Sequence, residues 1–311
     1  MKYAGPDLQR DVDGLSAFAG GSSDPLDLTA TDPAAPSANT VRLFRRAIAN
    51  RQFPAFVGPS GLDSALQPML ARNKVGFWCP PGNTTTVPGV LGFTAYTTTG
   101  TATIRNVATT NLFTRLRRAG WVSAATAGSF AATRVAVAQI TLGTTIGGMA
   151  AGGFFKVIRF GTSDAAAVSG ARMFVGISSS TGAPSNVEPS TITNCIGVGH
   201  GAADSNLKLF YGGSSIQTPI DLGANFPANT LFTDIYELAL FCAPGSEVVG
   251  YQVTRLNSGH VASGTLTAAS SGVQLPSPTT LLTYSSNWRC NNATAAAVGL
   301  DIFSDYIETD S

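Results

Sequence analysis

Residues 152–178 read GGFFKVIRFGTSDAAAVSGARMFVGIS, and this stretch predicts two β-strands separated by a polar loop. In the first run, Phe155 and Val157 fall on one side while Phe154 and Ile158 fall on the other, which is the two-residue period of a strand. Because both sides are largely apolar, we expect this strand to be central in its sheet. The loop TSDAAAVSG is short and made of small side chains, which favours a turn between antiparallel partners over a helical crossover.

Further strand patterns follow this pair at intervals of roughly 8 to 12 residues, with no helical pattern between them. Turn signals at Ala243–Ser246 and Asn257–Gly259 separate some of these strands. Thr-rich stretches between residues 75 and 142 also predict short strands, and residues 112–130 allow at most a short helix. The sequence therefore predicts an all-β fold, with an antiparallel β-sandwich or jelly-roll C-terminal domain behind an extended N-terminal arm. The later strand patterns are residues 194–200, 207–213, 235–243, 248–256 and 294–308.

Two regions of different character divide the chain. Residues 1–75 are expected to form an extended arm and a hairpin, for attachment and an oligomer neck. Residues 76–311 are expected to form the β-rich region that ends in the sandwich, with a possible further boundary near residues 120–150. The first 39 residues are rich in Asp, Gly, Ser, Pro and Ala. We expect them either to become ordered along a partner, as an anchoring arm, or to remain an unbound tail.

The first region carries charges of both signs. Acidic residues of the arm include Asp7, Asp11 and Asp13. A hairpin predicted over residues 41–58 carries a local basic patch. This patch could contact the acidic arm of a neighbouring subunit or a negative groove on a docking protein, or it could be a solvated face of the hairpin. These residues are the candidate docking or oligomer contacts. The basic residues are Arg42, Arg45, Arg46 and Arg51.

Composition excludes several classes of partner. Charged residues make up 12% of the chain and the formal net charge is +1, which argues against nucleic acid as the main partner. No apolar run reaches the roughly 18 residues of a membrane-spanning helix, so we expect no membrane insertion. The first residues lack the apolar segment of a signal peptide, so we expect synthesis in the cytoplasm.

Candidate groups for chemistry are few. Cys195 and Cys242 lie in apolar strand patterns and are expected to be buried, although a disulfide stays open for them as for Cys79 and Cys290. With no C-x-x-C spacing we expect no metal and no cofactor. The two histidines, His200 and His260, lie in Gly-rich surroundings that read as loops, and neither joins a nucleophile motif. We therefore expect no catalytic residue.

Two weaker site patterns remain. Glu237 and Asp301 lie in strand patterns and could face each other across a groove, as the acids of glycan-cleaving tailspikes do, or could be ordinary exposed acids. Aromatic residues could provide flat faces for sugar rings, and loops such as GHGAADSN or YSSNWRCNN could supply hydrogen-bonding groups, although aromatics in strands are more often core. Trp288 is the least core-like of them. The candidate receptor contacts are Trp288, Tyr284 and Tyr211.

Short blocks along the chain are similar to a known protein class. Residues 41–44 (VRLF) and 56–68 (FVGPSGLDSALQP) resemble the N-terminal attachment region of appendage proteins of tailed bacteriophages, such as tail fibres and head or collar fibres. The resemblance continues in residues 73–92, 220–229, 236–241 and 306–310. It implies a structural, homotrimeric fibre or knob protein of the virion, made in the host cytoplasm and anchored to other virion proteins by its N-terminus. It assigns no binding residue.

Three functions follow as hypotheses. The first is a non-enzymatic structural component of a phage appendage, with a distal sandwich knob. The second is a receptor-binding module that recognises a host surface glycan or protein through the same knob. The third is a glycan-cleaving tailspike, which needs two carboxylates facing one groove.

Overall fold

The computed structural model describes residues 34–37, 40, 42–57, 63–65, 74–80, 85 and 96–309. The chain divides into two compact units, one of residues 1–47 and 52–68 and one of residues 48–51 and 69–311. Asp7, Asp11 and Asp13, with most of the predicted arm, lie outside the described residues.

The first unit contains a small three-stranded sheet in the order β1 (Arg42–Ile48), β2 (Arg51–Val57) and β3 (Asp63–Ala65). The turn between β1 and β2 is Ala49–Asn50, and both residues have positive φ, 49° and 65°. Two positive φ values in a two-residue turn fit the right-handed twist of the flanking strands. The predicted hairpin is therefore confirmed. Its turn, residues 48–51, is counted with the second unit.

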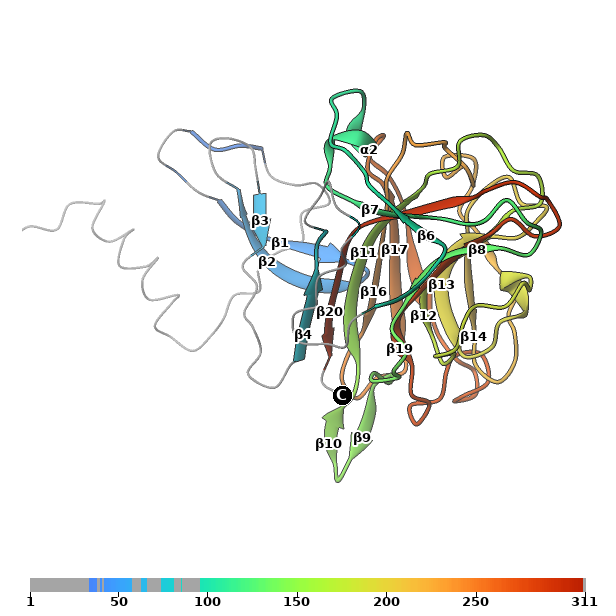
Figure 1. Cartoon of the computed structure of the whole chain (residues 1–311). Helices are drawn as coiled ribbons and strands as arrows, with labels where there is room; N and C mark the ends of the chain where they lie inside the picture. The colour runs from blue at the N-terminus through green and yellow to red at the C-terminus, as the bar shows by residue number, and fades with distance from the viewer. Residues whose placement is uncertain are drawn as a thin grey trace, which may run out of the picture. The chain divides into compact units, whose positions relative to one another are not determined.

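The second unit is built from two large antiparallel sheets (Figure 1). The eight-stranded sheet has the order β18-β17-β16-β11-β20-β7-β6, and β4 also pairs with β20. Its strands are β4 (Lys74–Trp78), β6 (Thr101–Thr103), β7 (Ala119–Val122), β11 (Phe154–Thr162), β16 (Tyr236–Cys242), β17 (Val249–Arg255), β18 (His260–Leu266) and β20 (Gly299–Thr309).

The seven-stranded sheet has the order β15-β14-β13-β12-β19-β8-β5. Its strands are β5 (Thr97–Thr99), β8 (Phe130–Arg134), β12 (Arg172–Ser178), β13 (Cys195–His200), β14 (Lys208–Gly212), β15 (Ile220–Asp221) and β19 (Thr283–Cys290). The small elements of the unit are α2 (Leu112–Arg115), the 3-10 turn η1 (Pro189–Thr191), and a hairpin of β9 (Thr144–Ile146) and β10 (Met149–Ala151).

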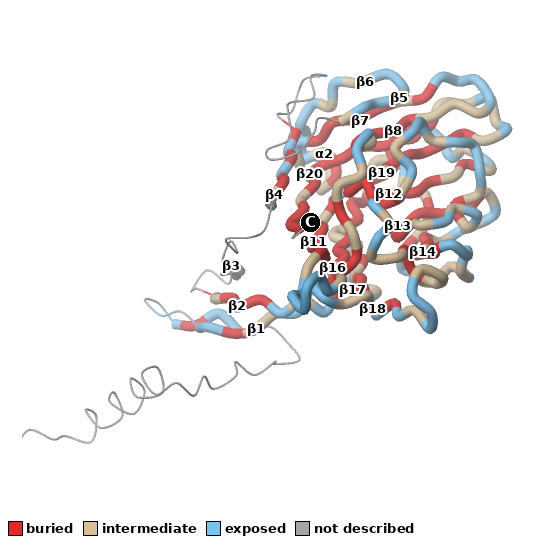
Figure 2. Tube along the Cα trace, turned by 90° about the horizontal axis from the view of Figure 1, so that it is seen from below, coloured by how far each residue is buried: buried red, intermediate tan, exposed pale blue. Residues whose placement is uncertain are grey.

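One hydrophobic core fills the space between the two sheets. Ile158 and Leu238 enter it from the eight-stranded sheet, while Val175, Val198 and Leu209 enter it from the seven-stranded sheet. Buried stretches run along the strands of both layers in Figure 2. Two sheets with a shared apolar interior form a β-sandwich. The predicted fold class is therefore confirmed.

The two strands predicted in residues 152–178 both form, as β11 and β12, but they are not partners. β11 lies between β16 and β20 in the eight-stranded sheet, so its predicted central position is confirmed. β12 lies between β13 and β19 in the other sheet, and the prediction of an antiparallel pair is wrong. Residues 163–171 pass from one layer to the other, and a connection of this length can span the roughly 10 Å between packed sheets.

The predicted turns near the end of the chain are confirmed. β16 pairs with β17 in the register Leu238–Val253 and Leu240–Tyr251, on either side of the turn at residues 243–246. β17 then pairs with β18 beyond the turn at residues 257–259. α2 is four residues long and capped by Asn111, which agrees with the short helix expected there.

Candidate functional site

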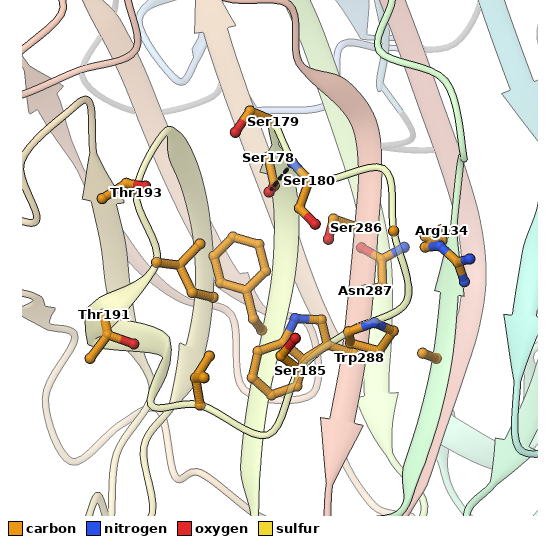
Figure 3. Close-up of a pocket in the computed structure, with 16 residues that line it drawn as sticks. Arg134, Ser178, Ser179, Ser180, Ser185, Thr191, Thr193, Ser286, Asn287 and Trp288 are labelled. Atoms are coloured by element: carbon orange, nitrogen blue, oxygen red, sulfur yellow. Dashed lines mark hydrogen bonds between the residues drawn. The ribbon is translucent and has the colours of Figure 1, made fainter.

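A pocket of about 350 Å³ opens on the outer face of the seven-stranded sheet (Figure 3). β8, β12 and β19 form its floor, and the loop of residues 179–193, which connects β12 to β13, forms its wall. Pockets that hold small molecules usually measure about 300–1,000 Å³. This one is at the small end of that range.

Two stacked aromatic rings make the floor. Phe174 and Trp288 have ring centroids 6.3 Å apart and an interplanar angle of 29°, and Phe130 meets the Trp288 ring edge-on. They belong to a second apolar cluster that is separate from the sandwich core. The separation follows from strand alternation, because Met173 and Val175 on either side of Phe174 point into the core.

Glycines in the neighbouring strand make room for the floor. A Cβ atom at Gly197 would lie 2.7 Å from Cζ of Phe174, so only glycine leaves space for that ring. A Cβ atom at Gly199 would lie 1.9 Å from the carbonyl oxygen of Met173. β13 can therefore lie close against β12 only because these positions carry no side chain.

Hydroxyl groups surround the aromatic floor. Ser178 lies at the end of β12, where its hydroxyl accepts a hydrogen bond from the amide of Ser180. Arg134 donates from Nε to the carbonyl oxygen of Thr181, which ties β8 to the loop. Arg134 is the one charged residue among the described residues of the lining, and the other polar groups there are uncharged. The lining hydroxyl residues are Ser178, Ser179, Ser180, Ser185, Thr191, Thr193 and Ser286.

A buried ionic cluster holds β19 in place directly beside Trp288. Arg289 is 0% exposed and donates from Nε to Oδ1 of Asp164 at 2.9 Å. Asp164 also accepts from the backbone amide of Gly299 at 2.8 Å and from Asn229 at 2.8 Å. The carboxylate thus joins the loop after β11 to β19 and to the start of β20. Buried charges need such partners.

His200 completes this cluster. Arg289 donates from Nη1 to Nε2 of His200 at 2.7 Å, and Nδ1 of His200 donates to the carbonyl oxygen of Gly201. Because a guanidinium group can only donate, the imidazole is neutral with its proton on Nδ1. Burial, with the adjacent Arg289 charge, lowers the pKa of His200 to about 4. His200 ends β13 and is 4% exposed, so its placement in a loop was wrong.

The three aromatic residues predicted as receptor contacts do not share one place. Trp288 lies in β19 and is 5% exposed, which corrects the prediction that it lies in a polar loop. Its neighbours are polar because they alternate into a hydrogen-bonded strand, not because the chain turns there. Tyr284 is in the sandwich core, and Tyr211 packs against that core. Of the three, only Trp288 lines the pocket.

The four basic residues predicted as docking or oligomer contacts fall in both units. Arg51 pairs with Glu308 at 2.7 Å and lies 4.6 Å from the ring centroid of Phe155. These contacts are all within the second unit. Arg42, Arg45 and Arg46 belong to the first unit, where Arg46 lies over the ring of Phe44.

Glu237 and Asp301 do not form a pair of acids in a groove. Glu237 binds Arg159 on the surface at 2.6 Å. Asp301 is 0% exposed and is held by Arg105 and Arg118 at 2.9 and 3.1 Å. A carboxylate enclosed by two guanidinium groups has no free face for a substrate.

Cys195 and Cys242 are buried, as predicted, and all four cysteines are free thiols. Burial raises the pKa of Cys195 to about 12 and that of Cys242 to about 11, so both are unreactive at neutral pH. Within the described part of the chain, no group of three or more His, Cys, Asp or Glu residues could hold a metal ion. In the same residues, no helix has the length and apolar character needed to cross a bilayer.

Sequence reasoning missed most of the pocket. The run SSSTGAPS at residues 178–185 was a signal for it, because small hydroxyl residues directly after an apolar strand indicate an exposed polar loop. Phe174 gave no such signal, since its place in an apolar strand resembles a core position. Only the pairing of β12 with β19 brings Phe174 opposite Trp288.

Comparisons with known proteins give only distant likenesses. No family model matches the sequence, and neither does any curated protein. A protein of unknown function from Shewanella oneidensis has 13% identity and a TM-score of 0.46, over 76% of this chain and 86% of that one. The lectin UEA-II, solved with galactose, has 14% identity and a TM-score of 0.45, over 78% and 99%. Arcelin-5, a lectin-like defence protein from Phaseolus vulgaris, has 10% identity and a TM-score of 0.42, over 77% and 99%.

These solved structures are similar in their strand arrangement alone. At such identities and TM-scores, what they bind carries no weight for this chain.

Proposed function

We propose that this chain is a non-enzymatic carbohydrate-binding module, and that its ligand is one or two rings of an uncharged surface glycan. The observation that supports this most is the combination in one pocket of an aromatic floor with a rim of hydroxyl groups. Sugars have apolar C–H faces and many hydroxyl groups, so they match both features at once.

The hydroxyls of the rim are suited to this ligand. The side-chain hydroxyls of Ser185, Ser286 and Thr193 make no hydrogen bond to another group in the described part of the chain. A serine or threonine hydroxyl both donates and accepts, so it can pair with a sugar hydroxyl in either direction. The small volume, about 350 Å³, limits the bound portion to a short saccharide.

A virion appendage is the proposed setting of this module. The support is the sequence resemblance of residues 41–44, 56–68 and the later blocks to phage appendage proteins. In that setting the N-terminal region attaches to other virion proteins, the chain forms a homotrimer, and the sandwich contacts the host surface. Detection of the chain by peptide mass spectrometry in purified phage particles tests this setting, and its absence from them contradicts it.

Binding to an array of immobilised glycans tests the carbohydrate proposal. We expect the fluorescently labelled full chain to bind a group of uncharged saccharides. Ser286→Leu, which places a larger side chain in the pocket, should weaken that binding at least about tenfold, the equivalent of about 1.4 kcal/mol.

Ser263→Leu is the matched control, because Ser263 is an exposed residue of β18 in the other sheet. It should leave binding unchanged. Binding to no glycan, or equal binding by wild type and Ser286→Leu, would contradict the proposal. Trp288→Phe adds a second test, since it keeps a ring in the floor while removing the indole N–H.

A further inference from the structure

A lysine and an aspartate meet inside the sandwich core. Lys156 of β11 and Asp305 of β20 have side chains that are 0% and 1% exposed, and Nζ lies 2.5 Å from Oδ1. The two residues are 149 positions apart in the sequence. The two charged groups are therefore in direct contact, with no room for water between them.

Aromatic residues enclose this pair. The hydroxyl of Tyr96 donates to Oδ2 of Asp305 at 2.5 Å, which leaves Oδ1 for the lysine. The ring of Tyr284, from the other sheet, has its centroid 5.6 Å from Nζ. No second charged side chain is recorded in contact with Lys156 or Asp305 within the described residues.

An apolar enclosure changes the protonation of such a pair. Burial lowers the pKa of Lys156, while the Asp305 charge opposes that shift. Burial also raises the pKa of Tyr96 well above its usual value, so its hydroxyl keeps its proton and remains a donor. The short contact places Oδ1 of Asp305 where it can accept a proton from Nζ.

We propose that Lys156 and Asp305 become joined by an isopeptide bond between Nζ and Cγ, a covalent cross-link between β11 and β20. In the first step a proton passes from Nζ to Oδ1; the lone pair of the resulting neutral amine then attacks Cγ, and the negative charge that develops on Oδ2 is stabilised by the hydroxyl of Tyr96. A proton moves from Nζ to the Oδ1 hydroxyl, which leaves as water while the C–Oδ1 bond breaks. One amide and one water form from one amine and one carboxylic acid, without oxidant or reductant.

The fold supplies the proximity that this condensation needs. Two groups held in contact react as if at a very high effective concentration. Pairing of β11 with β20 sets Ile158 opposite Asp305 and Lys156 opposite Ile307, so the two reacting side chains are diagonal neighbours on one face. The buried core also excludes water, so hydrolysis, the reverse of the condensation, lacks one of its reactants.

A second Lys–Asp pair in the same chain provides an internal comparison. Nζ of Lys208 lies 2.6 Å from Oδ1 of Asp204, nearly the same distance. Those side chains are 28% and 18% exposed, and the side-chain hydrogen bond to Asp204 raises the pKa of Lys208. That amine stays protonated and cannot attack, so the proposal predicts a bond at the buried pair alone.

Mass spectrometry of the full chain tests the cross-link. We expect an intact mass lower than that of the sequence by one water molecule. Trypsin digestion should yield peptide 135–159, uncut at Lys156, joined to peptide 290–311. Fragmentation of this species should place the link at Lys156 and Asp305.

Variants complete the test. Lys156→Met should restore the full sequence mass, while Lys208→Met should retain the loss of water. Tyr96→Phe, which keeps the ring but removes the donor, should slow the appearance of the joined peptides. The proposal is overturned if the wild-type chain has its full sequence mass and yields peptides 135–156 and 290–311 separately, or if the water is lost at another site. The wild-type digest decides this even if Lys156→Met does not fold.

Discussion

The effect of pH on stability should depend on His200 in a way that can be calculated. Its pKa in the folded chain is about 4, against 6.5 for an unperturbed histidine. Each unit of difference corresponds to about 1.4 kcal/mol, so the full effect is about 3 kcal/mol. The size follows from a neutral imidazole that accepts a hydrogen bond from Arg289 in a buried site.

The sign follows from which state takes up the proton. Above pH 6.5 both the folded and the unfolded chain hold His200 neutral, and the group adds no pH dependence. Between about pH 6.5 and pH 4 the unfolded chain binds a proton that the folded chain refuses, so the free energy of unfolding falls as the pH falls. Below about pH 4 both states are protonated and the contribution is constant.

Urea denaturation followed by tryptophan fluorescence, from about pH 7.5 to about pH 4, measures this effect. His200→Gln keeps a hydrogen-bond acceptor for Arg289 but cannot titrate. We expect the stability of the wild type relative to His200→Gln to fall by about 3 kcal/mol over that range. His260→Gln is the matched control, because His260 is exposed, and it should leave the slope unchanged. An equal pH dependence in wild type and His200→Gln would refute the reasoning.

Four further predictions concern the stability of the folded chain and its oligomeric state. Asp164→Ala leaves the guanidinium of Arg289 buried without its carboxylate partner and should lower the free energy of unfolding by about 3–5 kcal/mol in the denaturation assay. A decrease below about 1 kcal/mol would contradict the stabilising role of the buried ionic cluster. Gly199→Ala places a methyl group against the carbonyl of Met173 and should cost about 1–3 kcal/mol or more, whereas Gly182→Ala, with open space around it, should cost almost nothing. Lys156→Met should lose more stability than the about 3–5 kcal/mol expected for breaking a buried ion pair, because it also removes a cross-link that closes a loop of 149 residues, and a loss within that range would weigh against the bond. Light scattering of the full chain should give the mass of a trimer, and a stable monomer would contradict the proposed oligomer.

The sequence was enough to predict the strands and the class of fold. Alternation along Phe154–Phe160 and the turn at residues 243–246 are local signals, and both appear in the structure as β11 and as the β16–β17 hairpin. Strand pairing was not predictable in the same way. The loop of residues 163–171 has the composition of a turn, yet it crosses between the sheets, where Asp164 binds Arg289 of β19.

The site was less accessible to sequence reasoning than the fold. Glycines at 197 and 199 suggested a loop around His200, but they serve close packing inside a strand. Trp288 stood among polar residues and looked exposed, whereas those residues alternate within β19. Both errors have the same cause, since a strand covered on both faces by other parts of the chain need not be apolar throughout.

A crystal structure of the full chain with the best-binding saccharide from the array tests the central claim most directly. The account predicts a sugar ring in the pocket over Trp288 and Phe174, with its hydroxyls within hydrogen-bond distance of Ser286 or of the loop of residues 179–193. A sugar bound elsewhere on the sandwich, with this pocket holding only water, would contradict it.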